Sequence, residues 1–117
     1  MTPPFVPERG DTIWLDLQPT VGHEQSGRRP VLVMTPREYN GLTGLAVVCP
    51  LSNQQKGYGF EVPLPVGLGV TGVVLVDQLK CVDWRHRNVR FLTKVPRDFV
   101  DRVARRVARL LQVPQRA

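Results

Sequence analysis

Proline and glycine divide the apolar part of this chain into short pieces. The 117 residues include eleven prolines and ten glycines, and only short apolar runs lie between them. Residues 12–17 alternate apolar and polar side chains, which is typical of a half-buried strand. Proline lacks a backbone donor and therefore interrupts a strand that is paired on both sides. This pattern predicts several short strands that form a small barrel or sandwich.

The expected strands are bounded by these prolines and glycines. Pro19 is expected to end the first strand, and Pro50 the third. A helical turn is expected at residues 37–43, a segment that contains the turn signal Asn40-Gly41. The predicted strands cover residues 12–17, 31–34, 45–49, 60–62 and 72–82, and residues 84–92 are predicted to be extended and basic.

The last twenty residues follow a helical rather than an alternating pattern. Pro96 suits the first turn of a helix, and Asp98 lies near the positive end of its dipole. Several arginines fall outside the apolar stripe, so the sequence predicts an amphipathic helix packed on the strands. The residues of the apolar stripe are Phe99, Val100, Val103, Ala104, Val107, Leu110 and Leu111.

The net charge of +6 is concentrated in the last third of the chain. Residues 1–84 contain six Lys or Arg against eight Asp or Glu, whereas residues 85–117 contain ten against two. A basic excess favours an anionic partner. Chemistry in the first two thirds must therefore use individually placed charges.

The two cysteines, Cys49 and Cys81, both lie in apolar stretches. We expect two buried, free thiols in a reducing cytoplasm. The N-terminus has no secretory signal pattern, and no apolar run approaches the roughly 20 residues that span a bilayer. Paired Cys or His residues typical of a zinc site are also missing, so no metal or cofactor is expected.

The polar loop at residues 18–29 contains candidate catalytic residues. Pro30 favours an extended conformation for Arg29 at the junction between the loop and the next strand. A guanidinium held there could bind a phosphate with two parallel hydrogen bonds. Glu24 could accept a proton or pair with that arginine. The residues alone favour the plainer interpretation of a surface Glu–Arg pair worth about 0–1 kcal/mol.

A second polar loop, residues 52–58, offers groups that suit single-stranded nucleic acid. Lys56 could contact a phosphate, Gln54 a base edge, and Tyr58 could stack on a base. A solvated hairpin loop is the alternative interpretation.

Further along, Trp84, Arg85 and Arg87 could contact RNA or form an exposed strand end. For His86 we find no second histidine or carboxylate at a spacing that builds a catalytic dyad, so a surface or RNA-contact role is expected. His23 is expected to be a solvated loop residue.

Taken together, these segments resemble the MazF/PemK toxins of bacterial toxin–antitoxin pairs. The resemblance extends from about residue 5 to residue 111, where the amphipathic helix completes the pattern. The matching segments are Gly10-Asp11, Ile13-Trp14, Gly22-x-Glu24-Gln25-x-Gly27-x-Arg29-Pro30, Pro36, Tyr39-Asn40, Pro50, Lys56-Gly57-Tyr58, Asp77-Gln78 and Trp84-Arg85.

The resemblance implies a single domain, residues 1–117, with an SH3-like β-barrel that forms a homodimer. It also implies a metal-independent endoribonuclease, without a cofactor, that cuts single-stranded RNA at a short sequence. In that reaction the 2′-hydroxyl attacks the adjacent phosphate and leaves a 2′,3′-cyclic phosphate and a 5′-hydroxyl. A MazE-like antitoxin would block the site with an acidic, flexible tail.

Carried over by position, Arg29, Glu24 and Ser52 surround the scissile phosphate. Ser52 stands where the family usually has Thr, which keeps the hydroxyl but loses the stiffening methyl group. Because a guanidinium keeps its proton at neutral pH, we expect Arg29 to act as a charged clamp, Glu24 as the proton acceptor and Ser52 as a hydrogen-bond donor. The residues assigned to RNA binding are Gln25, Gln54, Lys56, Tyr58, Gln78, Trp84, Arg85 and Arg87.

Two other functions are compatible with a small basic barrel. The related fold of the CcdB toxins poisons DNA gyrase by binding it, without catalysis. A plain RNA-binding SH3-like module would likewise need no catalytic residues. The cluster of Glu24, Arg29 and Pro30 in one loop favours an enzyme over both alternatives.

Overall fold

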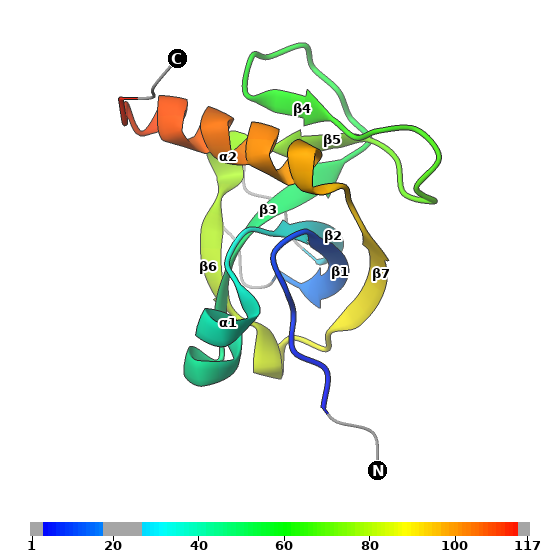
Figure 1. Ribbon diagram of the computed structural model, residues 1–117. Helices are drawn as coiled ribbons and strands as arrows, with labels where there is room; N and C mark the ends of the chain where they lie inside the picture. The colour runs from blue at the N-terminus through cyan, green and yellow to red at the C-terminus, as the bar shows by residue number, and fades with distance from the viewer. Residues whose placement is uncertain (1–3, 18–26, 115–117) are drawn as a thin grey trace.

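The computed structural model describes residues 4–17 and 27–114. It consists of short strands and two helices, with 3-10 turns η1 (Val76–Gln78) and η2 (Trp84–His86) between the later strands (Figure 1). The helices are α1 (Arg37–Thr43) and α2 (Arg97–Leu110). The strands are β1 (Asp11–Asp16), β2 (Arg28–Val33), β3 (Leu45–Ser52), β4 (Glu61–Pro63), β5 (Val73–Leu75), β6 (Lys80–Asp83) and β7 (Arg90–Lys94).

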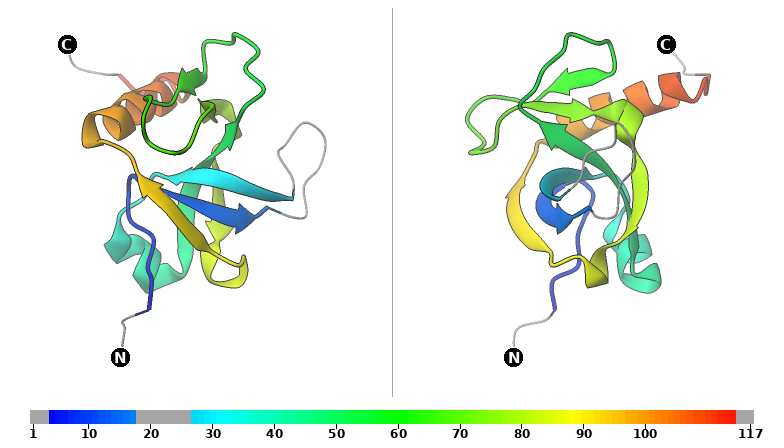
Figure 2. Two further views of the ribbon diagram at one scale, coloured as in Figure 1. Left: turned by 90° about the vertical axis from the view of Figure 1, so that its right-hand side faces the viewer. Right: turned by 180° about the vertical axis from the view of Figure 1, so that it is seen from behind.

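Strand β3 is the centre of the sheet. Its first half pairs with β6 and its end with β5, while β2 pairs along its other side. The strand order is β4-β5-β3-β2-β1-β7, and every pairing in the described part is antiparallel. The sheet curls into an incomplete barrel, with β4 and β7 at the two ends of this order (Figure 2). The prediction of a mainly β protein with a barrel-like sheet and a C-terminal helix is confirmed.

The alternation of side chains on β2 and β3 separates two hydrophobic clusters. Leu32 pairs with Cys49, and both face the cluster under α2. The adjacent pair, Val33 and Val48, faces the second cluster, inside the curl of β1, β2, β3 and β6. The sheet is therefore apolar on both faces at its centre. This explains why the residues of β2 and β3 read as continuous apolar runs.

Helix α2 covers the first of these clusters. Phe99, Val100 and Val103 are fully buried against β3, β4 and β5, and each contributes about 1.5–3 kcal/mol by leaving water. The prediction that Leu110 and Leu111 continue this buried stripe is wrong, because both are exposed. The C-terminal end of α2 projects beyond the strands (Figure 1), and Val107 is the last residue of the helix that packs against the core cluster.

Three predicted strands have wrong boundaries, each for reasons of strand pairing. Strand β2 begins at Arg28 and not at Val31, because Arg28 and Arg29 pair with β1. Strand β3 does not stop at Pro50 but runs to Ser52. Pro50 lies between the residues paired with β6 and those paired with β5, where its missing donor costs no ladder hydrogen bond. The predicted long strand 72–82 is instead divided into β5, η1 and β6, because its two halves pair with opposite ends of β3.

The segment predicted to be extended at 84–92 begins with the 3-10 turn η2 and enters β7 only at Arg90. Trp84 is buried, and its indole nitrogen donates to the backbone oxygen of Asn40 at 3.0 Å. The predicted helical turn at 37–43 is confirmed as α1. In the described part of the chain, no helix has the length and apolar character needed to cross a membrane.

Candidate active site

The pairing of β2 with β3 brings Arg29 and Ser52 to one place. The β2–β3 ladder ends at the pair Val31–Pro50, and Arg29 and Ser52 each lie two residues beyond that pair on their strands. Both line one small depression of about 220 Å³, together with Trp14, Pro30 and neighbouring residues.

The hydroxyl of Ser52 is oriented by the backbone that follows it. The amide of Gln54 donates to Oγ of Ser52 at 3.0 Å. Because this bond uses a lone pair, the hydroxyl proton stays available for an acceptor such as a phosphoryl oxygen. The side chain is also nearly buried, at 9% exposure. Gly72 packs against this strand end, since a Cβ there would lie 2.4 Å from the carbonyl oxygen of Ser52.

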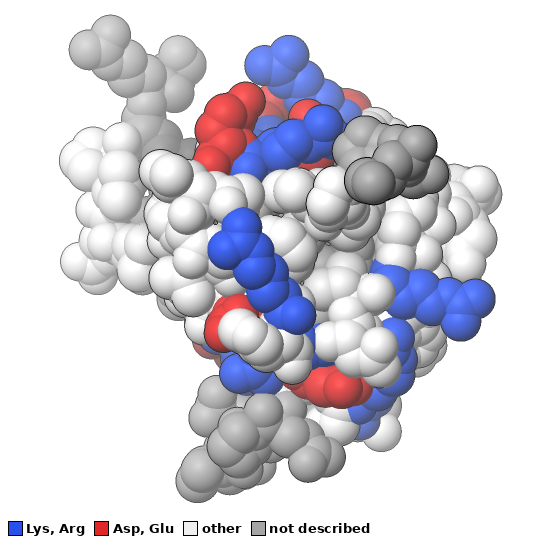
Figure 3. All heavy atoms as spheres, turned by 90° about the horizontal axis from the view of Figure 1, so that it is seen from below, with Lys and Arg blue, Asp and Glu red and all other residues white. Residues whose placement is uncertain are grey.

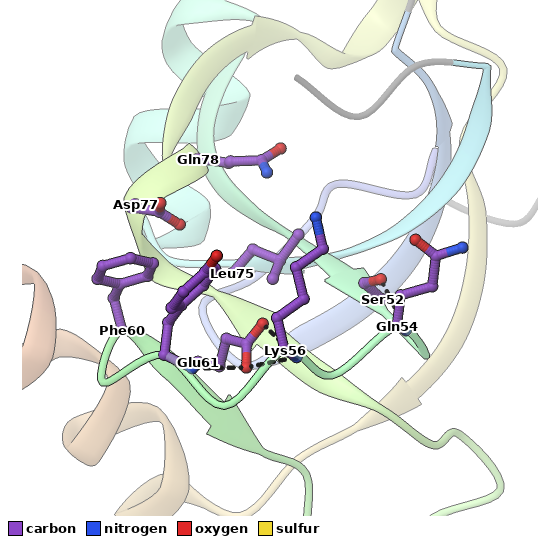
Figure 4. Close-up of a pocket in the computed structure, with 9 residues that line it drawn as sticks. Ser52, Gln54, Lys56, Phe60, Glu61, Leu75, Asp77 and Gln78 are labelled. Atoms are coloured by element: carbon purple, nitrogen blue, oxygen red, sulfur yellow. Dashed lines mark hydrogen bonds between the residues drawn. The ribbon is translucent and has the colours of Figure 1, made fainter. Parts of the chain in front are cut away.

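A larger pocket of about 340 Å³ opens on the other side of Ser52. Four of the predicted RNA-binding residues are in or near the loop that walls it, and the structure brings them together: Gln54, Lys56, Tyr58 and Gln78. Figure 4 shows the amine of Lys56 reaching toward the space between Gln78 and Ser52. The pocket volume falls in the range of about 300–1,000 Å³ that is usual for small-ligand sites.

The sequence analysis missed four residues of this pocket: Phe60, Glu61, Leu75 and Asp77. The rings of Tyr58 and Phe60 lie with their centroids 5.4 Å apart, tilted by 36°. Asp77 belongs to the matching segment Asp77-Gln78, so that motif could have placed it beside Gln78. Glu61 had no such signal, because a lone acidic residue at the start of a short strand usually faces solvent.

Glu24 and Gln25 lie outside the described residues, and so does His23. The described residues on either side of this loop are joined by a hydrogen bond. The amide of Leu17 donates to the carbonyl oxygen of Gly27 at 2.9 Å. The loop therefore begins and ends at the same place, next to Arg28 and Arg29.

Three of the residues assigned to RNA binding lie outside both pockets. Trp84 is 6% exposed and its indole is hydrogen-bonded, so its ring cannot stack on a base without leaving the core. Arg85 packs over that ring, 5.2 Å from its centroid, and donates to the carbonyl oxygen of Gly41. Arg87 donates to the carbonyl oxygen of Asp16 at 2.8 Å. All three contacts are with the protein itself.

The thiols differ from the prediction of two buried cysteines. Cys49 is buried, but Cys81 is exposed because its side chain lies on the outer face of β6. Burial raises the pKa of the Cys49 thiol to about 12, and the negative charge of Asp77 adds to the effect. A thiol with so high a pKa stays protonated and unreactive.

The charged side chains outside the site are arranged in local pairs. A hydrogen bond from Lys94 and the nearby charge of Arg37 lower the pKa of Glu8, and a hydrogen bond to His86 lowers that of Asp83. Figure 3 shows basic and acidic side chains interspersed over one face of the molecule. No cluster of three His, Cys, Asp or Glu that could hold a metal ion occurs among the described residues.

Comparisons with known proteins identify the family of the chain. The family model of the PemK-like, MazF-like toxins of type II toxin–antitoxin systems matches residues 8–111. The chain belongs to this family. The endoribonuclease toxin MazF of Escherichia coli strain K12 is 48% identical over 83 residues, which cover 71% of this chain and 74% of that toxin. The endoribonuclease PemK of Escherichia coli is 43% identical over 109 residues, covering 89% and 81%.

Solved structures agree with this MazF/PemK assignment. The crystal structure of MazF from Deinococcus radiodurans aligns with a TM-score of 0.89 and 47% identity, covering 93% of this chain and 99% of that one. A MazE–MazF crystal structure from the same organism aligns with a TM-score of 0.83 and 41% identity, covering 95% and 100%. Because the matched relatives are named endoribonucleases, this chain is a member of an enzyme family, as the sequence predicted.

Proposed function

We propose that this chain is the endoribonuclease toxin of a toxin–antitoxin pair and cleaves single-stranded RNA in the depression lined by Arg29 and Ser52. The observation that carries the proposal is the depression that Arg29 and Ser52 line together, in which the Ser52 hydroxyl is oriented by the Gln54 amide. Next to them lies a pocket with amides, a lysine and two aromatic rings. A phosphate subsite and a base subsite would then share Ser52.

The reaction fits an attack of the RNA on itself. The 2′-oxygen forms a bond to phosphorus, the bond from phosphorus to the 5′-oxygen breaks, and the products are a 2′,3′-cyclic phosphate and a 5′-hydroxyl. The proton of the 2′-hydroxyl must go to a base, and the 5′-oxygen must gain one. We assign the base to Glu24. Because a guanidinium retains its charge at neutral pH, Arg29 stabilises the negative phosphorane instead.

Ser52 has a separate role in this proposal. Its oxygen already accepts the Gln54 amide, so its proton can be donated to a nonbridging phosphoryl oxygen. Lys56 would contact a neighbouring phosphate, while Gln54 and Gln78 would read base edges and Tyr58 would stack on a base. Gln25 stays assigned to RNA binding by its position in the matching motif. Arg85 and Arg87 would reach RNA only beyond the pocket.

Incubation of the pure protein with a single-stranded RNA tests the activity. One arm contains EDTA and the other contains magnesium. We expect cleavage in both arms, and new ends that polynucleotide kinase labels without prior phosphatase treatment, because they carry a 5′-hydroxyl. Sequencing those ends gives the preferred cleavage site. Intact RNA in both arms would contradict the proposed endoribonuclease activity. Ends with a 5′-phosphate would contradict the attack by the 2′-hydroxyl.

We also propose that the partner is an acidic, MazE-like antitoxin, that the whole chain is one toxin domain, and that it acts as a homodimer in the cytoplasm. The solvent side of α2 carries Arg102, Arg105 and Arg109, all exposed. An acidic tail bound there would lose affinity steeply as salt rises. The test compares the salt dependence of antitoxin binding between the wild type and a triple alanine variant of these arginines. If antitoxin affinity had the same salt dependence in both proteins, α2 would not be part of the antitoxin interface. Light scattering of the pure toxin tests the dimer.

A further inference from the structure

Glu61 is a buried carboxylate beside an exposed loop. It is the first residue of β4 and is 8% exposed, whereas every residue from Asn53 to Phe60 is exposed. Burying a carboxylate is costly unless hydrogen bonds replace its water. The residues around Glu61 must therefore supply those bonds.

Three consecutive backbone amides of the loop supply them. Oε1 of Glu61 accepts from the amides of Lys56 at 3.1 Å, Gly57 at 2.8 Å and Tyr58 at 3.2 Å. Oε2 accepts from Lys56 as well, at 3.1 Å. Successive amides turned toward one anion form a backbone nest. Gly57 makes this turn possible because its φ of +84° is strained for any residue with a side chain.

The nest fixes two residues that line the pocket. Lys56 and Tyr58 have their amides on Glu61, and their side chains both reach the pocket wall. Figure 4 shows the carboxylate lying beneath the loop and the lysine amine reaching away from it, toward Gln78 and Ser52. The oxygens of Glu61 point at the amides, so its carboxylate is occupied by the loop itself.

We propose that Glu61 is a positioning residue that holds Lys56 and Tyr58 in the conformation that binds RNA, by anchoring the amides of residues 56–58. This inference rests on the proposed ribonuclease function and deepens it. Glu61 touches no reacting atom. It orders the loop before RNA binds, so that the long side chains of the loop lose less conformational entropy on binding.

The other anchors lie mainly at the ends of the loop; in its middle, the carbonyl oxygen of Tyr58 also accepts from the amide of Glu61 at 3.1 Å. Thr71 donates to the side chain of Asn53 at 3.1 Å, and Arg106 donates to the carbonyl oxygen of Gly59. The carbonyl oxygen of Phe60 accepts from Val76 at 3.0 Å. Loss of the Glu61 charge should therefore loosen residues 55–58 while the two ends stay attached.

The variant Glu61→Gln tests the proposal because it keeps the shape but replaces one acceptor with a donor. We expect KM for a short RNA to rise about tenfold, the scale of losing charge-assisted hydrogen bonds. The pH dependence of the rate at saturating RNA should not change, because Glu61 is not the base. Glu38→Gln, an exposed glutamate on α1, is the matched control and should leave both quantities unchanged.

A double-mutant cycle separates positioning from a general structural role. In a chain that already carries Lys56→Ala and Tyr58→Ala, Glu61→Gln should raise KM by less than about twofold, since the residues that it positions are gone. The proposal fails if the folded Glu61→Gln variant has the KM of the wild type. It also fails if the tenfold effect persists in the double-alanine background.

Amide hydrogen exchange on the wild type gives a test that needs no variant to fold. The amides of Lys56, Gly57 and Tyr58 should exchange well below the rate of an unstructured chain, despite their place in an exposed loop. Exchange at the unstructured rate would overturn the proposal. A wild type that shows this protection but cuts no RNA would refute the ribonuclease function instead, so the two failures are distinguishable.

Discussion

Arg29 and Ser52 are both held by strand pairing. Arg29 is paired with Leu15 of β1 and Ser52 with Val73 of β5, and Pro30 limits the backbone freedom of Arg29. A guanidinium held in this way can meet a transition state without first being ordered, which is where fixed charges are most effective.

We therefore predict that Arg29→Ala lowers the single-turnover rate of RNA cleavage by about 10²–10³-fold, with little change in the stability of the fold. Arg29→Lys should recover only part of this loss, because an ammonium cannot make the bidentate contact of a guanidinium. Arg37→Ala serves as the control. Arg37 is the first residue of α1, pairs with Glu8 and lies outside both pockets. Equal rates for Arg29→Ala and Arg37→Ala would exclude Arg29 from the site.

Ser52→Ala should also slow cleavage, by about 10²-fold, because it removes a donor to the phosphoryl oxygen. The change also takes away the acceptor of the Gln54 amide, so a drop in RNA affinity is expected alongside the slower step. Ser52→Thr keeps the hydroxyl, adds a methyl group and should keep most of the activity. Single-turnover rates at saturating RNA measure the first effect, and their dependence on RNA concentration measures the second. An unchanged rate for Ser52→Ala would contradict the assigned role.

At the scale of residues, the sequence predicted loop members but not their surroundings. Gln54, Lys56 and Tyr58 were found because a loop of amides, cation and aromatic ring has a recognisable composition, and the structure places them in one pocket. Trp84 misled the prediction because an aromatic residue among arginines has the same composition whether its ring faces solvent or the core. The low exposure of Trp84 and the hydrogen bond of its indole to Asn40 show that this ring is buried.

At the scale of elements, α1 is attached to the sheet through one buried side chain. Asn40 is fully buried, and its amide nitrogen donates to the carbonyl oxygens of Pro7 at 2.8 Å and Thr35 at 2.9 Å. Its side-chain oxygen accepts from the Thr35 hydroxyl at 2.6 Å. A single asparagine thus joins the N-terminal segment, the end of β2 and the helix.

Asn40→Ala should lower the free energy of unfolding by about 3 kcal/mol, because it leaves several buried polar groups without partners. Urea unfolding at a fixed protein concentration measures this loss. Glu38→Ala, on the exposed side of the same helix, should change stability by no more than about 0.5 kcal/mol. If the two variants unfold alike, the Asn40 hydrogen bonds do not hold α1 in place.

The element boundaries show which information a sequence carries and which it does not. Periodicity predicted β1 and α2 well, because α2 buries one face and exposes the other, and β1 alternates buried and half-buried residues from Ile13 to Asp16. It failed at Pro50 and within residues 72–82, where the outcome depends on which strands pair with each end of β3. Pro50 does not end β3, because it lies between the residues paired with β6 and those paired with β5. The continuous apolar run of residues 72–82 changes direction at η1 and forms two strands. Neither fact is visible without the pairing.

At the scale of the whole molecule, the buried Cys49 makes stability depend on alkaline pH. Burial raises the pKa of this thiol from 9.0 to about 12. Below pH 9 the thiol is protonated in both states and the fold keeps its full stability. Between about pH 9 and 12 the unfolded chain ionises while the folded one does not, so the free energy of unfolding falls by about 1.4 kcal/mol per pH unit.

Urea unfolding at pH 8.5, 9.5 and 10.5, at one protein concentration, measures this slope. The buried variant Cys49→Val lacks the thiol and should lose the slope, while keeping an apolar side chain in the cluster beneath α2. Cys81→Ala removes the exposed thiol and should keep the slope.

Burial opposes the charge of Lys94, but hydrogen bonds to Asp11 and Glu8 raise the pKa of that amine overall. Stability from Lys94 is therefore also lost at high pH, but equally in both variants, so the difference between them isolates Cys49. Parallel curves for the two cysteine variants would show that Cys49 ionises freely in the fold, and hence that the core beneath α2 is open to water.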